Sequence, residues 1–232
     1  MIPIQDQNPT SIKPYVNWAF ITANIAVFVY TLTNGTFSET LTSCAASPTN
    51  TICQYGLKPS NIISGTEYIT FLTSMFLHGG ILHIGGNMLY LWIFGDNIED
   101  ATGHLGYIIF YMAAGAAASL AHITSDPSSM VPAVGASGAI SGVLGAYIVR
   151  FPHARVRAIV FIGRFGQLIR LPAYILIGFW FVYQLLLSLI DVEGGVAYFA
   201  HIGGFIAGLV FAFAIPKKKP EQPGGTSYPQ FS

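Results

Sequence analysis

Ser137 has the residue type and the setting of a nucleophile. It stands in the Gly-Ala-Ser-Gly segment 135–138, where a loop with proline and glycine runs into an apolar stretch of helical length. His201 stands in a later apolar stretch that also carries Gly204 and Gly208 at helical spacing. Glycine lets two helices approach closely, and close approach lets an imidazole take the proton of a serine hydroxyl. The pattern predicts a Ser–His pair for hydrolysis; glycine-mediated helix packing with structural Ser and His bonds is the alternative.

Two more polar side chains in apolar surroundings are suited to stabilise the negative charge of such a reaction. His83 and Asn87 are one helical turn apart and therefore face the same way. Both donate hydrogen bonds, and the backbone N–H of Ser137 at a helix start adds a third donor to an oxyanion hole. A metal site of His78, His83 and His201 is an alternative, but the sequence lacks an H-E-x-x-H motif and an obvious acidic general base. We therefore expect neither a metal nor another cofactor. Structural roles are expected for the remaining histidines, His104, His122 and His153.

The overall composition indicates where this chemistry takes place. Of the 232 residues, 53% are hydrophobic and only 9% are charged, with a formal net charge of zero. A soluble domain carries about 25% charged residues. The neutral balance argues against a nucleic-acid partner and against an acidic disordered chain. We therefore expect an integral, multi-pass membrane protein whose environment is the lipid bilayer.

Apolar stretches of the length that crosses a bilayer set the expected architecture. Six are predicted, at 16–32, 81–94 (extending to 98), 105–121, 131–151, 171–190 and 196–215. The fold class expected is an all-α membrane protein, a bundle of six transmembrane helices. A helix from Ser137 to Arg150 is about 20 Å long, shorter than the ~30 Å hydrocarbon core. Ser137 is therefore expected some 10 Å (roughly) below the outer surface, beside a water-filled cavity.

The basic residues predict the orientation of the bundle. With six crossings, nine of the ten lie on one side: Lys13, Arg150, Arg155, Arg157, Arg164, Arg170, Lys217, Lys218 and Lys219. The positive-inside rule makes that side cytoplasmic, together with both termini. A loop holding Asp96, Glu99 and Asp100, between the second and third spans, is expected on the same side.

These assignments divide the chain into three parts. A cytoplasmic segment (1–14) precedes the membrane domain (15–215), and a disordered cytoplasmic tail (216–232) follows it. The long loop 33–77 lies outside and holds Cys44 and Cys53, for which an oxidising compartment permits a disulfide; two unpaired thiols are the alternative. No basic segment with a cleavage site precedes the first span, so we expect an uncleaved anchor.

At these residues the sequence resembles the rhomboid intramembrane serine proteases of the prokaryotic six-span type. The segment 135–138 matches the family's G-x-S-G, 78–87 matches its H-x-x-x-N stretch with an upstream histidine, and 200–208 matches its terminal histidine helix. The three motifs occur in family order on the second, fourth and sixth spans. The resemblance covers roughly 15–215, nearly the whole membrane domain.

The resemblance implies an activity and the residues that perform it. Ser137 would attack a peptide carbonyl and His201 would act as general base and then acid, while His83, Asn87 and the Ser137 N–H would stabilise the oxyanion. The implied partners are single-span transmembrane substrates, cleaved within or near their membrane segment. The implied location is the cell (inner) membrane of a prokaryote, with the site opening to the outer face. The oligomeric state, the natural substrate and the cleavage-site preference stay open.

Some features fit the family less directly. Phe179, Trp180, Phe181 and Tyr183 of the fifth span, with the loop 191–196, resemble the family's substrate gate and cap, although aromatics facing lipid are an equal alternative. Ser141 stands where many members have an aromatic residue that stacks on the histidine. Ile69-Thr70 stands where many have Trp-Arg. A transporter and a catalytically silent relative are the rival functions; the spans show no acidic centre or internal repeat for the first, and Ser137 and His201 are intact, against the second.

Overall fold

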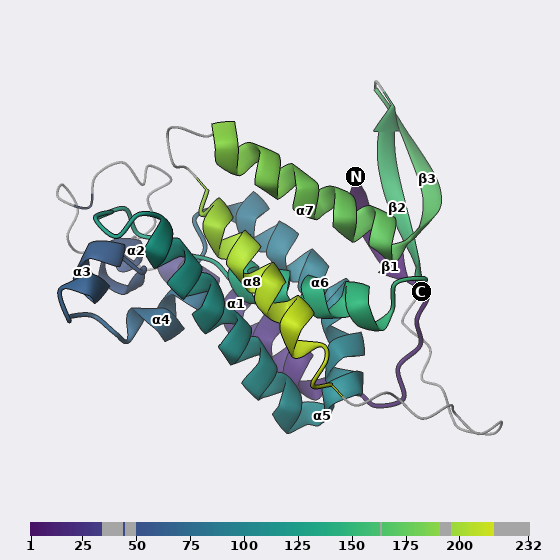
Figure 1. Ribbon diagram of the computed structural model, residues 1–232, viewed down its shortest axis with the longest axis horizontal. Helices are drawn as coiled ribbons and strands as arrows, with labels where there is room; N and C mark the ends of the chain where they lie inside the picture. The colour runs from purple at the N-terminus through teal and green to yellow at the C-terminus, as the bar shows by residue number, and fades with distance from the viewer. Residues whose placement is uncertain (34–43, 45–49, 163, 191–195, 216–232) are drawn as a thin grey trace.

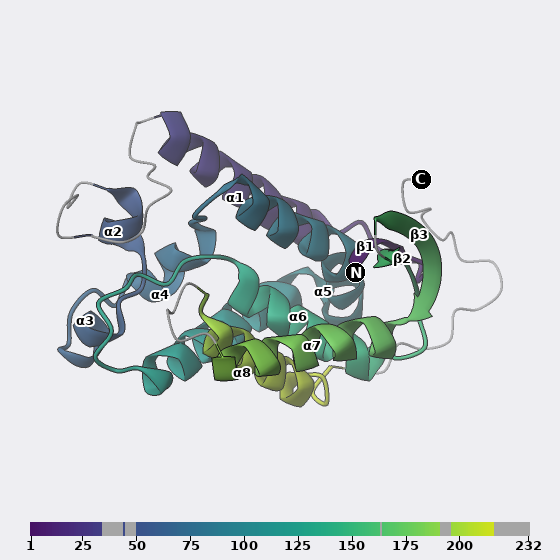
Figure 2. The same ribbon diagram turned by 90° about the horizontal axis from the view of Figure 1, so that it is seen from above.

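The computed structural model describes residues 1–33, 44, 50–162, 164–190 and 196–215, and it is mostly helical. The longer helices are α1 (Tyr15–Thr33), α5 (Ile81–Ser125), α6 (Ser137–Arg150), α7 (Ala173–Ile190) and α8 (Tyr198–Phe211). The short ones are α2 (Thr51–Tyr55), α3 (Pro59–Ile63), α4 (Thr70–Thr73) and the 3₁₀ helix η1 (Ser74–Phe76). The strands are β1 (Ile2–Asp6), β2 (Arg155–Ile162) and β3 (Phe165–Pro172). The sheet lies at one end of the helix bundle and α2–α4 lie at the other (Figures 1 and 2).

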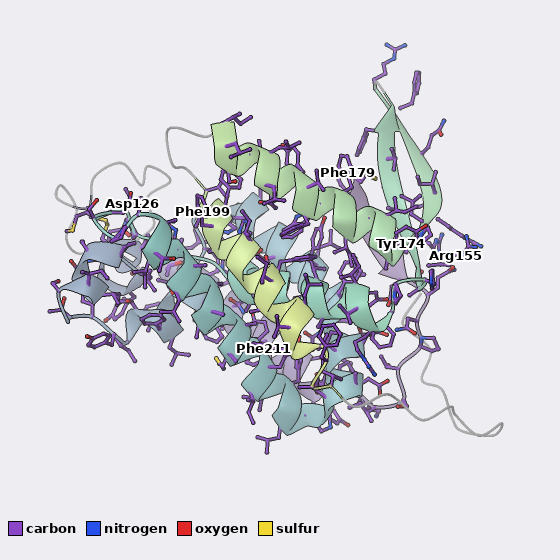
Figure 3. The ribbon with its side chains drawn as sticks, viewed as in Figure 1. Asp126, Arg155, Tyr174, Phe179, Phe199 and Phe211 are labelled. Carbon is purple, nitrogen blue, oxygen red and sulfur yellow. A yellow bond between two sulfur atoms is a disulfide. The ribbon has the colours of Figure 1, made fainter. Side chains whose placement is uncertain are left out.

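Apolar side chains cover much of the outside of the bundle. Phe179 on α7 and Phe199 on α8 are among the large apolar side chains that stand exposed (Figure 3). Within the described residues, α1, α5 and α7 are long and apolar enough to cross a membrane, and α8 is a shorter apolar helix. Lipid solvates such surfaces as water does not. The helices therefore have the character of a membrane protein, while the predicted number of crossings stays a prediction.

Helix α5 joins the two stretches predicted as the second and third spans. It turns at Gly103, whose φ of 71° and ψ of 166° lie outside the helical region. The predicted loop before this turn is wrong, because Asp96 and Glu99 lie in the helix and are buried, with 8% and 0% of their surface exposed. The Asp96 carboxylate accepts hydrogen bonds from the backbone and side chain of Asn97, and the Glu99 carboxylate accepts them from another segment of the chain.

The N-terminal segment supplies part of these bonds. Glu99 accepts hydrogen bonds from the backbone N–H groups of Val16 (3.0 Å) and Asn17 (2.7 Å), at the start of α1. A carboxylate at this position satisfies N–H groups that have no partner within the helix and interacts favourably with the helix dipole. Asp6 of β1 is buried and accepts a hydrogen bond from the hydroxyl of Tyr147 on α6 (2.5 Å). The segment before α1 is thereby fixed to α5 and α6.

The antiparallel sheet, in the order β1-β2-β3, corrects the all-α expectation. Val156 and Ala158 are fully buried, whereas Arg155 is exposed and Arg157 is half-buried, so side chains alternate between two faces of β2. This period of two is the pattern of a strand with one buried face. The arginines of this segment were used only to predict the orientation of the bundle, and the alternation of apolar residues with them was not used to predict a strand.

Glycines bring α6 and α8 into backbone contact, as the sequence predicts. A Cβ atom at Gly204 would overlap the carbonyl oxygen of Gly138, and one at Gly208 would overlap that of Gly142. Larger residues at these positions would push the helices apart. Ser137 and His201 lie at the same end of this contact, because each is near the start of its helix.

The segment before α6 is held by the loop that precedes α5. Leu57 and Ala133 exchange two backbone hydrogen bonds (3.0 and 2.8 Å), and Gly135 N–H donates to the carbonyl of Ser74 (2.9 Å). Gly135 has a φ of 128°, a region that favours glycine. These bonds fix the chain that leads into Ser137.

A disulfide closes the same loop at its other end. Cys44 and Cys53 are joined, with their Cα atoms 5.4 Å apart, which decides between the disulfide and the two unpaired thiols that the sequence left open. The loop also contains an ion pair between Lys58 and Glu67 (3.2 Å). The hydrogen bond from Asn61, together with Lys58, lowers the pKa of the Glu67 carboxyl below its usual value. The tail 216–232 and the loop 191–195 lie outside the described residues, and so do the predictions that concern them.

Candidate active site

Ser137 and His201 form the centre of the site. The Oγ atom of Ser137 lies 2.7 Å from Nε2 of His201, although the two residues are 64 positions apart. Ser137 is the first residue of α6 and His201 is in the first turn of α8, and both are partly buried. The glycine contact between the two helices allows this distance. The structure therefore brings together the two side chains that the sequence pairs.

A third side chain contacts the histidine from α7. Nδ1 of His201 lies 2.9 Å from Oε1 of Gln184, which is 8% exposed. An amide oxygen only accepts hydrogen bonds, so Nδ1 carries the proton in this arrangement, and Nε2 is left to accept from the Ser137 hydroxyl. Sequence analysis missed Gln184. Its signal was available: a lone amide side chain in the apolar segment 171–190 is costly in a membrane unless it is paired.

Aromatic rings from α7 and α8 lie beside His201, whereas many family members have an aromatic residue at the position of Ser141. The ring of Trp180 on α7 is 6.1 Å from the imidazole, and that of Tyr198 on α8 is 6.4 Å away at a steep angle. Ser141 is fully buried, and its hydroxyl donates to the carbonyl of Ser137 (2.6 Å). The space beside the imidazole is therefore bounded by α7 and α8 rather than by α6.

His83 approaches the site from α5. A Cβ atom at Gly135 would lie 2.8 Å from Nε2 of His83 and 3.5 Å from Oγ of Ser137, so the imidazole and the hydroxyl both lie next to the same point beside this glycine. The backbone N–H of Gly79 donates to Nδ1 of His83 (3.4 Å), which leaves Nε2 with the proton in the neutral ring. A donor of His83 is thus near Ser137. The ring of His78 packs edge-on against His83 at 5.1 Å.

Asn87 follows His83 by one turn on the same face of α5. Its side chain is buried, and its Nδ2 group has no hydrogen-bond partner among the described residues. A buried donor without a partner is costly. Asn87 is related to Ser137 through His83, because Asn87 and His83 share one face of α5.

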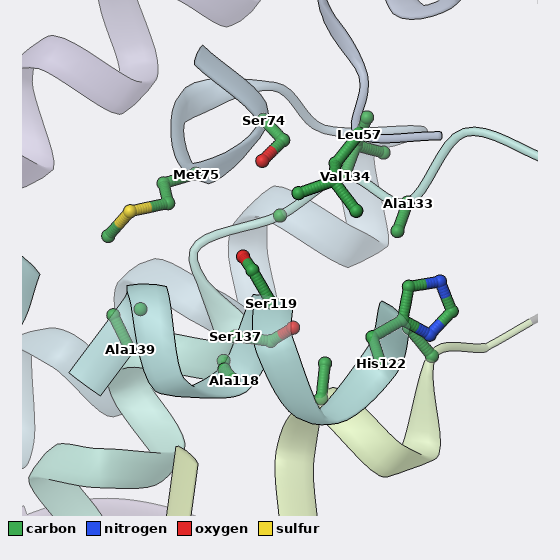
Figure 4. A pocket seen from close by; sticks show the side chains of 15 residues that line it. Leu57, Ser74, Met75, Ala118, Ser119, His122, Ala133, Val134, Ser137 and Ala139 are labelled. Atoms are coloured by element: carbon green, nitrogen blue, oxygen red, sulfur yellow. The ribbon is translucent and has the colours of Figure 1, made fainter. Parts of the chain in front are cut away.

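A cavity adjoins Ser137 at the start of α6. Ser137, Ser119 and His122 lie around it, together with Val134 and Leu57 from the loops (Figure 4). His122, expected from the sequence to have a structural role only, therefore lines the cavity next to the serine. His104 and His153 are elsewhere: His104 pairs with Glu99 (2.5 Å), and the ring of His153 contacts Tyr174.

The start of α6 offers further donors to the cavity. No side chain caps this helix end. The first N–H groups of a helix have no partner within it, and the helix dipole is positive there. A hydroxyl bonded to an imidazole, next to uncapped N–H groups and a second imidazole, is an arrangement that performs nucleophilic attack on a carbonyl and stabilises the resulting oxyanion.

Comparisons with known proteins identify the family. The model of the Rhomboid domain matches residues 65–218, which include Ser137, His201 and Gln184 as well as His83 and Asn87. Rhomboid protease GluP of Bacillus subtilis is 32% identical over 204 residues, 88% of this chain and 35% of that protein. Rhomboid protein 1, mitochondrial, of Saccharomyces cerevisiae is 31% identical over 161 residues, 68% of this chain and 44% of its own length. RHOMBOID-like protein 4 of Arabidopsis thaliana is 25% identical over 235 residues, 90% of this chain and 56% of that protein. The chain thus spans about a third to a half of the length of these relatives. Since the domain match covers most of the chain, the chain belongs to the rhomboid family.

Proposed function

We propose that the chain is an intramembrane serine endopeptidase that uses Ser137 and His201 as a catalytic dyad. The observation that carries the proposal is the 2.7 Å distance between Oγ of Ser137 and Nε2 of His201. Membership of the rhomboid family and the name of the Bacillus relative support the same activity. The reaction is hydrolysis of a peptide bond, and it needs no cofactor.

Acylation begins when Ser137 Oγ attacks the scissile carbonyl carbon and its proton passes to His201 Nε2. The tetrahedral intermediate collapses as the C–N bond breaks, and His201 gives the proton to the leaving amine. The acyl group then stays on Ser137 as an ester. This sequence uses His201 first as general base and then as general acid.

Deacylation repeats these steps with water. His201 takes a proton from the attacking water, the second tetrahedral intermediate collapses, and Ser137 leaves with the proton returned by His201. The product is a carboxylic acid. The cavity at Ser119 and His122 offers polar surroundings next to the serine through which water reaches the ester.

The oxyanion of both intermediates would be held by His83, Asn87 and the backbone N–H of Ser137. Nε2 of His83 and the serine hydroxyl both lie close to Gly135, and the Nδ2 group of Asn87 has no partner among the described residues, so an oxyanion would supply one. No side-chain hydrogen bond from the N-cap residue caps the first turn of α6. Donors arranged before the reaction lower the barrier because they do not need to reorient.

The substrates proposed are single-span membrane proteins that enter beside α7. Phe179 and Tyr183 are exposed and line a second hollow with Tyr90 of α5, while Phe181 stacks on Phe205 of α8 at 4.2 Å. Of the aromatic side chains of α7, Phe181 therefore packs against the bundle, whereas Phe179 and Tyr183 face this hollow. The hollow also contains Trp180, which contacts His201, so it leads from the side of the bundle towards the dyad.

The orientation proposed has six crossings, both termini in the cytoplasm and the dyad near the outer face. Helix α6 has only 14 residues, about 20 Å of length, so a start at Ser137 is below the surface of a ~30 Å core. The sheet with Arg155, Arg157 and Arg170 is at the opposite end of the bundle from α2–α4 (Figure 1). The positive-inside rule places it in the cytoplasm.

The test is cleavage of a model single-span substrate by the protein in proteoliposomes. We expect the wild type to release two fragments, and we expect Ser137→Ala and His201→Ala to release none above background. Ser141→Ala is the matched control, because its hydroxyl belongs to the same helix and, among the described residues, donates to the backbone carbonyl of Ser137 and not to a group that reacts. Labelling by a fluorophosphonate should require both Ser137 and His201. Absence of cleavage by the wild type, or equal cleavage by Ser137→Ala, would refute the proposal.

A further inference from the structure

We infer that Gln184 is a positioning residue of the dyad: its side-chain oxygen fixes the tautomer and the ring orientation of His201, and so sets Nε2 to accept the proton of Ser137. This inference rests on the proposed function. It assigns to the polar side chain of α7 the role that a carboxylate has in three-residue serine hydrolases. The difference is that the amide orients the imidazole without carrying a charge.

The geometry of the contact supports the assignment. Nδ1 of His201 is 2.9 Å from Oε1 of Gln184, while Nε2 of the same ring is 2.7 Å from Oγ of Ser137. The three groups form one chain of hydrogen bonds in which the proton order is fixed by the acceptor-only amide oxygen. Without this acceptor, the neutral imidazole is free to carry its proton on Nε2, a tautomer that cannot act as a base towards Ser137.

The surroundings of His201 leave Gln184 as the group that selects the tautomer. Among the described residues, the ionisable side chains that interact electrostatically with His201 are His83 and His122, both from α5. Helix α6 contributes Ser137, and α7 contributes Gln184 and the apolar ring of Trp180. None of these neighbours is a carboxylate.

The position of Gln184 also links the dyad to α7. Gln184 and Trp180 both face the hollow beside α7, and both contact His201. A displacement of α7 away from α8 would therefore remove the acceptor of Nδ1 and one of the rings beside the imidazole together. The imidazole of His201 is oriented to accept the proton of Ser137 only while α7 is packed against α8.

Two substitutions separate positioning from packing. Gln184→Met keeps the length of the side chain but removes the acceptor, and we expect kcat to fall by about 10- to 100-fold with KM nearly unchanged, since only part of the benefit of the general base is lost. Gln184→Glu restores an acceptor and adds a charge that stabilises the imidazolium. We expect this variant to recover most of the rate and to move the acidic limb of the pH–rate profile to higher pH.

Ser188→Ala is the matched control. Ser188 is on α7 one turn after Gln184, and its hydroxyl bonds only the carbonyl of Leu185. We expect wild-type kcat and an unshifted pH profile. Melting temperatures of all variants in the same detergent separate loss of activity from loss of folded protein, and if Gln184→Met fails to fold, the pH shift of Gln184→Glu decides.

A spectroscopic readout distinguishes failure of this inference from failure of the proposed function. In ¹⁵N-histidine-labelled protein, His201 should show one neutral tautomer with a protected Nδ1–H, assigned by its loss in His201→Ala, and Gln184→Met should lose that protection. Wild-type rates and an unchanged tautomer in Gln184→Met overturn the inference. A wild type that does not cleave, with the tautomer still dependent on Gln184, refutes the protease proposal alone.

Discussion

Asn87 is the polar side chain of the site whose bonding in the resting protein is least complete. Its Nδ2 group is buried and has no partner among the described residues, whereas His201 bonds at both ring nitrogens. A donor left open in the ground state can form its bond when the oxyanion develops. Such a bond contributes to the transition state rather than to folding.

Replacing Asn87 with alanine should therefore affect the reaction more than the fold. We expect kcat to fall by about 10²- to 10³-fold, the usual effect of removing one oxyanion donor. The melting temperature should change little, because no bond of Nδ2 is lost. Steady-state cleavage assays and thermal melts of the same preparation check both points; full activity of Asn87→Ala would exclude it from the oxyanion hole.

At the scale of elements, the contact between α6 and α8 places the dyad. The overlap that a Cβ atom would cause at Gly208 is with the backbone carbonyl of Gly142, which cannot rotate away as a side chain can. The helices would have to separate. Because Ser137 and His201 are on these two helices, a separation also lengthens their hydrogen bond.

The Gly208→Ala variant should accordingly be less stable than the wild type and should cleave the substrate more slowly. We expect a loss of about 1–3 kcal/mol in the free energy of unfolding, as for other overpacked sites, together with a lower kcat. Gly178→Ala on α7 is the control, since a Cβ atom there meets nothing within 4 Å. Unfolding in denaturant and cleavage assays measure the two effects. Equal stability of both variants would contradict the role given to this contact.

The sheet and the N-terminal strand act at the same scale but away from the dyad. Tyr147 donates a hydrogen bond to Asp6 of β1, and Glu99 accepts one from Val16 at the start of α1. Strand β1 also pairs with β2. The glycine contact between α6 and α8 was predictable because the spacing of small residues along each helix is local. The pairing of β1 with β2 joins residues about 150 positions apart, and no local pattern contains it.

At the scale of the whole molecule, the orientation in the membrane is open to a direct test. Cys44 and Cys53 are bonded to each other, so the oxidised protein has no free thiol of its own. A cysteine in place of Arg164, near the turn between β2 and β3, should react with a membrane-impermeant maleimide only after the cells are opened. A cysteine in place of Ile63, the last residue of α3 and 64% exposed, should react in intact cells. The reverse pattern would invert the proposed topology.

The sequence by itself determined the class of protein and predicted most residues of the candidate site. Low charge indicates a membrane protein, and in apolar segments Ser137, His201, His83 and Asn87 are conspicuous because an isolated polar group there is costly. The start of the helix at Ser137 also followed from local signals, namely the proline and glycine before it and the apolar stretch after it. These properties depend on residue type and on short spacings.

Only the tertiary structure decided how the histidine is oriented and where the charged residues are buried. Gln184 becomes part of the site because α7 packs against α8. Glu99 can be buried because the start of α1 supplies a backbone donor to it, and its neighbour Asn97 donates to Asp6 of β1. A hydrogen bond between distant segments depends on the position of both partners. Spacing along one segment carries no information about the other, so these contacts had to be observed in the fold.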